Sequence, residues 1–243
     1  MNDYSSKNVT MNKTILTLLI LLFSTIGFAQ GKTKKNNARK QAVKMSKQQI
    51  NQMKNGALLV RLKTKKKSIE ALRKSGRNSK ADKLEKKQAK YNMGIVNGFK
   101  TDFDFCPTYF FYSDYSQAVY NKQFDNVEFL NDSLQYDSTI TFNNTSFLTA
   151  EFGIIEQDTA HYFDEYYYVP GQKNGQEKRK SYNGATNMSF GALIIKSDQF
   201  IQLKKPFPYY SRTLYSIPIR RSPKLVIKTM NSKLQTFHGR VNN

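Results

Sequence analysis

The sequence predicts an α/β fold in which helices sandwich a mixed β-sheet, preceded by a basic N-terminal region that is partly disordered and partly helical. Short apolar runs of strand length alternate along the chain with segments whose apolar residues recur at helical spacing. The distribution of basic and aromatic side chains along the chain also changes near residue 100. Residues 30–100 hold 22 basic against three acidic side chains, whereas 27 of the 32 Phe and Tyr residues follow residue 100. We therefore expect a basic, largely helical part joined to an aromatic-rich core.

Residues 1–29 are predicted to be a bacterial Sec-type signal peptide that starts at Met11. Lys13 supplies the positive charge, residues 15–23 are apolar, and small residues precede the expected cleavage after Ala29. The apolar run has about half of the roughly 20 residues that a membrane-spanning helix needs. The mature protein is therefore predicted to be periplasmic or secreted, with no transmembrane span left after cleavage.

Residues 30–48 are predicted to form a disordered basic arm, with helix only toward its end. From Gly31 to Lys47 there are seven basic side chains, no acidic ones and few apolar ones. Such a segment cannot bury enough apolar surface to offset the entropy lost on ordering. Residues 49–243 are predicted to be a single α/β domain, with a lysine-rich helical part over 49–100 and an aromatic-rich core over 101–243.

The lysine-rich part predicts one strand and two helices. The apolar run 57–62 is typical of a strand, and residues 68–74 form a helical pattern that ends before Gly76. Within 79–99 the larger apolar or neutral side chains recur at steps of three and four residues, and lysines populate the other face. This helix is expected to lay its apolar stripe on the domain and to expose its lysines.

The aromatic-rich core predicts a series of short strands and a closing helix. Strands are expected at 105–112, 127–130, 147–156, 192–196 and 200–203, with the last two forming a hairpin. A short helix is expected at 114–122, and polar loops at 132–144 and 171–186. Ser222 as N-cap, Pro223 at the first helical position and Gly239 as the stop define the C-terminal helix.

Four residues are candidates for catalysis: Asp114, Asp132, Asp158 and His161. Each aspartate follows a predicted strand. If those strands are parallel neighbours, the carboxylates converge at the edge where α/β proteins bind ligands, and a hydrolase with His161 as general base becomes possible. The alternative is structural: the aspartates cap a helix or begin polar turns, and His161 precedes a half-buried strand. We favour the structural interpretation, because the sequence does not give the strand order.

Eight lysines are predicted to bind anionic surfaces: Lys63, Lys65, Lys66, Lys67, Lys83, Lys86, Lys87 and Lys90. Basic surfaces bind polyphosphates through counterion release, with strong salt dependence. In an exported protein, phosphates of lipid or lipopolysaccharide fit the compartment better than nucleic acid does, and few aromatic residues interleave these lysines for base stacking. The alternative is a solvated face that only aids solubility.

Several chemistries are excluded by residue usage. Cys106 is the only cysteine, so no intramolecular disulfide forms, and its place in an apolar strand predicts a buried, unreactive thiol. One cysteine with His161 and His238 cannot supply a four-ligand structural zinc site, and no metal or cofactor is predicted. The G-x-S-x-G, P-loop and H-E-x-x-H motifs are absent. We therefore predict a non-enzymatic envelope protein that binds anionic surfaces, with a carboxylate-dependent hydrolase or an extracellular nucleic-acid-binding protein as alternatives.

Overall fold

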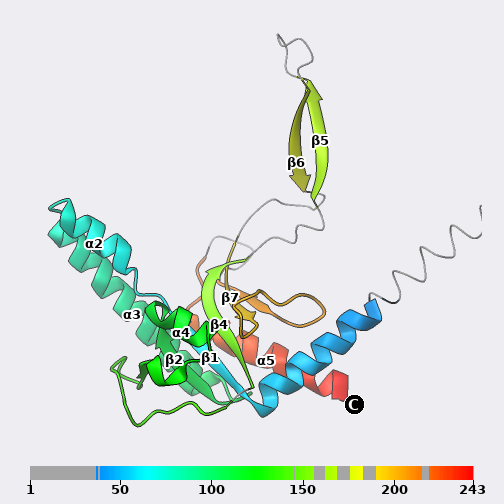
Figure 1. Cartoon of the computed structure of the whole chain (residues 1–243), viewed down its shortest axis with the longest axis horizontal. Helices are drawn as coiled ribbons and strands as arrows, with labels where there is room; N and C mark the ends of the chain where they lie inside the picture. Colours follow the sequence, from blue (N-terminus) through cyan, green and yellow to red (C-terminus); the bar gives the residue numbers. More distant parts are fainter. Residues whose placement is uncertain are drawn as a thin grey trace, which may run out of the picture. The chain divides into compact units, whose positions relative to one another are not determined.

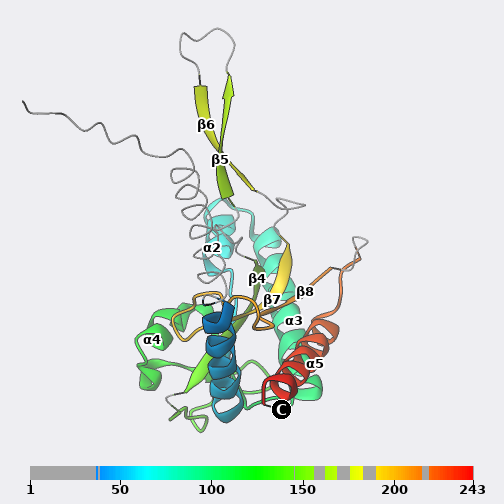
Figure 2. The same cartoon turned by 90° about the vertical axis from the view of Figure 1, so that its right-hand side faces the viewer.

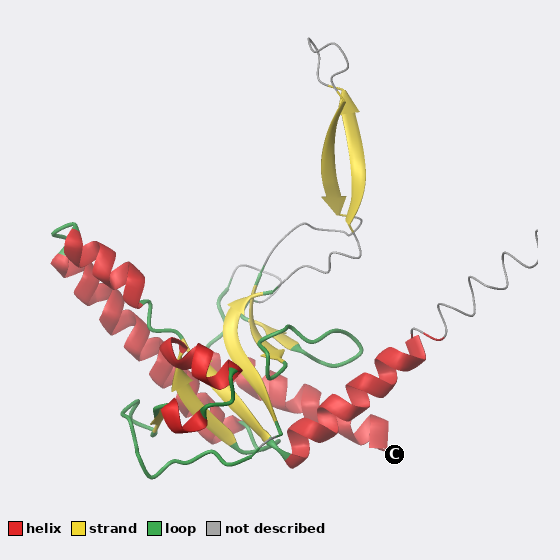
Figure 3. Ribbon diagram, viewed as in Figure 1, coloured by secondary structure: helices red, strands yellow, loops and turns green. Residues whose placement is uncertain are grey.

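The computed structural model describes residues 37, 39–144, 146–155, 162–168, 176–182, 190–214 and 219–242, with the backbone alone described over 162–168 and 176–182. It divides the chain into two compact units, Met1–Met45 and Ser46–Asn243. The second unit is an α/β domain with a mixed six-stranded sheet, which confirms the predicted fold class (Figures 1 and 3). The predicted signal peptide, Asp158 and His161 lie outside the described residues.

The sheet has the strand order β3-β2-β1-β4-β7-β8. Its strands are β1 (Ala57–Leu62), β2 (Thr108–Tyr112), β3 (Phe129–Leu130), β4 (Phe147–Ile154), β7 (Gly191–Lys196) and β8 (Tyr210–Arg212). β1 runs parallel to β2 and β4, its two neighbours, whereas β3, β7 and β8 pair in antiparallel fashion. β5 (Tyr162–Tyr168) and β6 (Gln176–Tyr182) form a separate antiparallel pair.

One face of the sheet is covered by helices α3 (Asn78–Asp102) and α5 (Pro223–Asn242), which pack on each other (Figure 2). Alternate residues of a strand point to opposite faces, and Leu58, Val60 and Leu62 of β1 enter this core. Phe99 of α3 and Leu234 of α5 are buried against them. As predicted, Ser222 caps α5, because its Oγ accepts a hydrogen bond from the Leu225 N–H at 3.4 Å.

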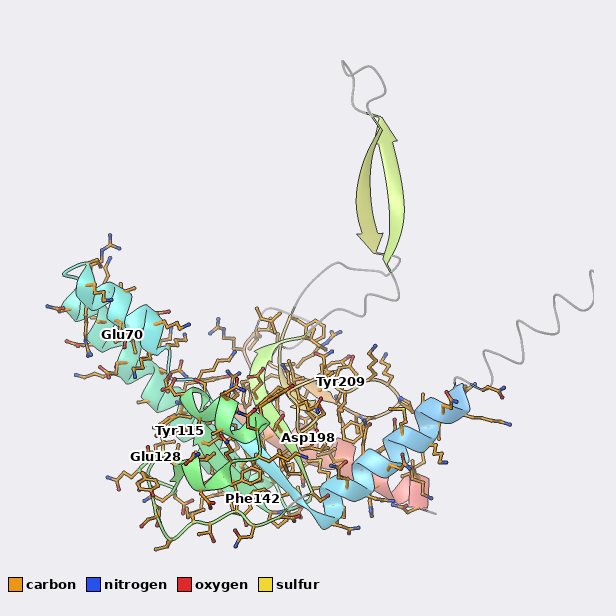
Figure 4. All side chains as sticks on the ribbon, in the orientation of Figure 1. Glu70, Tyr115, Glu128, Phe142, Asp198 and Tyr209 are labelled. Atoms are coloured by element: carbon orange, nitrogen blue, oxygen red, sulfur yellow. The ribbon has the colours of Figure 1, made fainter. Side chains whose placement is uncertain are left out.

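The opposite face is covered by short helices and an aromatic cluster. The helices are the 3₁₀ turn η1 (Ser113–Tyr115), α4 (Ser116–Tyr120) and the 3₁₀ turn η2 (Phe124–Asn126). Phe142, labelled in Figure 4, packs edge-on against Phe124 at 4.8 Å and Phe147 at 5.7 Å between ring centroids. Such edge-to-face pairs add about 0.5–1.5 kcal/mol beyond area burial, so this cluster fixes the segment 113–146 on the sheet.

Helix α2 (Lys66–Lys74) packs against the first half of α3 and forms a helical hairpin with it (Figure 3). Ile69 of α2 and Ala81 of α3 are buried. Arg73 binds the carboxylates of Glu85 at 2.7 Å and Asp82 at 3.5 Å. We call residues 63–90 the basic hairpin.

Four expectations about local structure differ from what is observed. Residues 30–48 are predicted to be helical only toward their end, but the whole of 39–48 belongs to a helix over 39–55, and within the second unit this helix buries Ile50 and Met53. Residues 176–182 are not loop but strand β6, which the pairing with β5 stabilises although its sequence is polar. Gly239 does not end α5, which continues to Asn242.

The fourth difference is the partner of β7. Residues 200–203 were expected to pair with it, but only a single bridge from Lys196 to Gln202 forms, and β8 is the paired strand. The Ser197 Oγ accepts hydrogen bonds from the N–H groups of Gln199 and Ile201, which prolongs the turn beyond the predicted two residues.

Candidate functional site

The eight lysines predicted to bind anions are all exposed on the basic hairpin or at its start. Among the described residues, none of these ammonium groups pairs with a carboxylate. On α3, Lys83, Lys87 and Lys90 lie three or four residues apart and share one face of the helix. The buried face of the same helix carries Ala81 and Gln88. The fold therefore leaves these positive charges directed at solvent.

The few acidic side chains of the basic hairpin do little to offset this charge. Residues 63–90 contain twelve basic and three acidic side chains. Asp82 and Glu85 are both bound to Arg73, and Glu70 lies exposed on α2 (Figure 4). Since Arg73 binds two of the three carboxylates, these do not offset the positive charge of the lysines.

The aspartates proposed for catalysis do not come together. Asp114 follows the carboxyl end of β2, where its carboxylate accepts a hydrogen bond from the Thr64 hydroxyl at 3.2 Å. Asp132 follows β3, which is antiparallel to β2, so it lies toward the opposite edge of the sheet and is bound there to Lys100. These two carboxylates therefore do not converge, in keeping with the structural interpretation that the sequence analysis favours. Asp158 and His161, the other two candidates, fall outside the described residues.

A different set of charges gathers at the carboxyl ends of β1 and β4. Arg61 and Glu151 are register partners, and Arg61 Nη1 lies 2.5 Å from Glu151 Oε2. Lys196 of β7 binds the other carboxylate oxygen of Glu151 at 3.0 Å. The Nε of Arg61 donates to the Ser116 hydroxyl at 2.7 Å. The side chains of Glu151 and Lys196 are only 11 and 12% exposed, so this ionic cluster is largely withdrawn from water.

The ionic cluster holds Glu151 in its charged form. Burial alone raises the pKa of this carboxyl, but the charges of Lys196 and Arg61, and the hydrogen bonds they donate, outweigh it and bring the pKa below its usual value. The sequence analysis missed these residues. The sequence does mark these residues, because each is a charged side chain inside an apolar run: Arg61 within 57–62 and Glu151 within 147–154. Buried charges are rare unless paired, so each such charge calls for a partner.

A second polar contact lies beside Asp114. The hydroxyl of Tyr115 hydrogen-bonds the Glu128 carboxylate, and this bond, followed by burial and nearby negative charge, raises the pKa of Tyr115 to about 12 (Figure 4). Tyr115 thus stays protonated near neutral pH. It acts as a hydrogen-bond donor that ties η1 to the segment before β3.

Cys106 is expected to react slowly with a disulfide reagent such as dithiobis(nitrobenzoic acid) in the native state and rapidly after unfolding. The thiol is buried, and burial raises its pKa to about 12, so almost no thiolate exists near neutral pH. The measurement is the release of the coloured thiolate with and without denaturant. Equal rates in the two states would contradict the buried environment. The predicted buried thiol is confirmed by its position in the core.

Within the described ranges, no three His, Cys, Asp or Glu side chains gather closely enough to hold a metal ion. No helix in this part of the chain is both long and apolar enough to cross a membrane. No protein family model matches the sequence, and no curated protein or solved structure is significantly similar to it.

Proposed function

We propose that this chain is an exported bacterial envelope protein, without catalytic activity, that binds anionic surfaces through its basic hairpin. The single observation behind the proposal is the set of eight exposed lysines on a folded element, none paired with a carboxylate among the described residues. Basic side chains near an anionic leaflet contribute roughly 1 kcal/mol each. A cluster of eight therefore supplies enough electrostatic attraction to hold a protein at a phosphate-bearing surface.

Two further points support a surface over the alternatives. The signal-peptide pattern of residues 1–29 directs the chain away from the chromosome. Within residues 63–90 there is no Phe, Tyr or Trp, so the basic hairpin has no ring on which a nucleic-acid base would stack. A hydrolase built on Asp114 and Asp132 has no support from the fold, because these residues follow antiparallel strands.

The test is co-sedimentation of the mature protein with phosphatidylglycerol vesicles, compared with neutral phosphatidylcholine vesicles. The hairpin variant replaces Lys66, Lys67, Lys83 and Lys87 by Gln. The control variant replaces four exposed basic residues elsewhere by Gln: Lys204, Lys205, Lys228 and Arg240. Both variants lose the same net charge, so only the position of the charge differs between them.

We expect the hairpin variant to bind anionic vesicles at least tenfold more weakly than the parent, and the control variant to change much less. Raising salt from about 0.1 M to 1 M shortens the Debye length from about 10 Å to about 3 Å and should release the parent protein. Equal losses in the two variants would show that net charge alone matters and would contradict a hairpin site. Tight binding to double-stranded DNA with no binding to vesicles would favour the nucleic-acid alternative.

A further inference from the structure

The neighbours β1 and β4 are the place in the sheet where the chain connections change faces. The connection from β1 to β2 includes α3, whose Ile95 and Phe99 belong to the core on one face. The connection from β3 to β4 passes over the other face, where Phe142 packs with Leu59 and Phe111. In open α/β sheets, ligands bind outside the carboxyl ends of the strands at such a switch point. The ionic cluster of Arg61 and Glu151 lies at this position.

The next same-face residues along the two strands lie close together at this corner. Because Arg61 pairs with Glu151 in a parallel register, the following same-face positions are Lys63 and Gly153. A Cβ atom placed on Gly153 would lie 3.8 Å from the Lys63 Nζ, 3.5 Å from Glu151 Oε1 and 3.6 Å from a methyl group of Ile194. The ammonium group of Lys63 therefore lies over the end of β4. Gly153 contributes only backbone beneath it.

The two cations have donor groups available. The guanidinium of Arg61 is fixed by bonds from Nε to Ser116 and from Nη1 to Glu151, and its Nη2 has no acceptor among the described residues. The Nζ of Lys63 has no partner there either. The Glu151 carboxylate is bound on both oxygens by Arg61 and Lys196, so its charge is already balanced by these two cations. A guanidinium held in place beside a free ammonium is suited to an oxyanion with several oxygens.

We propose that Arg61 and Lys63, with the backbone of Gly153 as the floor, form a discrete binding site for a phosphoryl group. The phosphoryl group can belong to a soluble phosphate ester or to a lipid headgroup, since both present the same oxygens. The site differs in kind from the rest of the basic hairpin: one guanidinium held in place, one ammonium beside it and a bare glycine recognise a single group, whereas the other exposed lysines attract any anionic surface.

The first arm of the test titrates inorganic phosphate into the mature protein at constant ionic strength, with chloride as the balancing ion, and follows backbone amide signals by NMR. We expect saturable shifts at Lys63 and Gly153. Lys63→Gln should weaken this binding by about tenfold or more, since it removes a charged hydrogen bond. Lys67→Gln removes the same charge from a nearby exposed residue and should change the affinity by less than about twofold.

The variant Gly153→Ala tests whether the bare backbone of Gly153 is needed for phosphate binding, and it leaves the charge of the site unchanged. The added methyl group meets only ordinary van der Waals contacts, so the fold should be retained while phosphate binding weakens. Preserved amide signals away from the corner check that retention. Unchanged phosphate affinity in a folded Gly153→Ala variant would overturn the proposed floor.

The second arm compares vesicles containing phosphatidic acid, a phosphate monoester, with phosphatidylglycerol vesicles of equal charge. Selective binding to phosphatidic acid that Lys63→Gln abolishes and Lys67→Gln does not would identify a headgroup as the source of the phosphoryl group. Equal effects of the two substitutions in both arms would overturn the site, and so would the absence of any saturable shift together with no headgroup selectivity. Either result leaves the vesicle test of the basic hairpin unaffected, so the two proposals fail separately.

Discussion

Replacing Glu151 by Gln is expected to lower the free energy of unfolding by about 3 kcal/mol, because it leaves the largely buried Lys196 and the partly buried Arg61 without their shared carboxylate. Arg61 and Lys196 lie 2.5 and 3.0 Å from the two oxygens of Glu151. The amide of Gln is nearly isosteric, so the change removes the charge while keeping the volume. The measurement is chemical denaturation followed by circular dichroism. Glu70→Gln, at an exposed carboxyl of the basic hairpin, is the control and should change stability by less than about 0.5 kcal/mol.

The difference in stability between the parent and Glu151→Gln should depend on pH in a defined direction. The pKa of Glu151 is lowered in the folded state from the ordinary value of 4.5. A carboxyl whose pKa falls on folding contributes its full stabilisation above the unfolded value and loses it as the pH drops through the folded value. The difference should therefore be constant from neutral pH down to about pH 5 and shrink below pH 4.5. A difference that grew on acidification would contradict the ion-paired state.

Helices and strands that carry a clear apolar pattern were predictable from the sequence. The strand over 57–62 and the helix over 79–99 are found as β1 and α3, because the first is an apolar run of strand length and the second has apolar residues at helical spacing. The polar strand β6 was not predictable, since the sequence QEKRKSY shows no apolar alternation, and this segment pairs with β5. Local sequence therefore predicts an element that carries an apolar run or an apolar period, and it does not predict a strand whose sequence is polar.

The two candidate sites also differ in how far the sequence predicts them. Exposure of the lysines on α3 could be predicted from the sequence, because a lysine on the polar side of an amphipathic helix faces solvent whatever the strand order is. The ionic cluster could not be predicted, because Arg61 and Glu151 are 90 residues apart and meet only through the pairing of β1 with β4. Whether Asp114 and Asp132 converge could not be predicted for the same reason: β3 runs antiparallel to β2, and no residue near Asp132 signals that direction.

Gly56→Ala is expected to destabilise the domain by about 3 kcal/mol, at the upper end of the usual cost of overpacking. Gly56 lies between the helix over 39–55 and β1. In the structure, a Cβ on this residue would lie 2.7 Å from the Gln52 carbonyl oxygen and closer still to that of Ser146. The Ser146 carbonyl also accepts the N–H of Ala57 at 3.2 Å, so it cannot retreat without loss of that bond. Chemical denaturation of the variant measures the effect.

Gly94→Ala is the matched control, because it adds the same methyl group within α3, where the nearest atom is a carbon of Pro223 at 3.7 Å. Alanine is favoured over glycine inside a helix by roughly 0.5–1 kcal/mol, so this variant should be slightly more stable than the parent. Opposite signs for the two substitutions would show that Gly56 is required by the close approach of a segment 90 residues away, and not by its own backbone preference. Similar small effects at both positions would mean that the segment before β4 shifts to accommodate the methyl group at little cost in free energy. The register of β1 against β4, which brings Arg61 to Glu151, would then need a different physical origin.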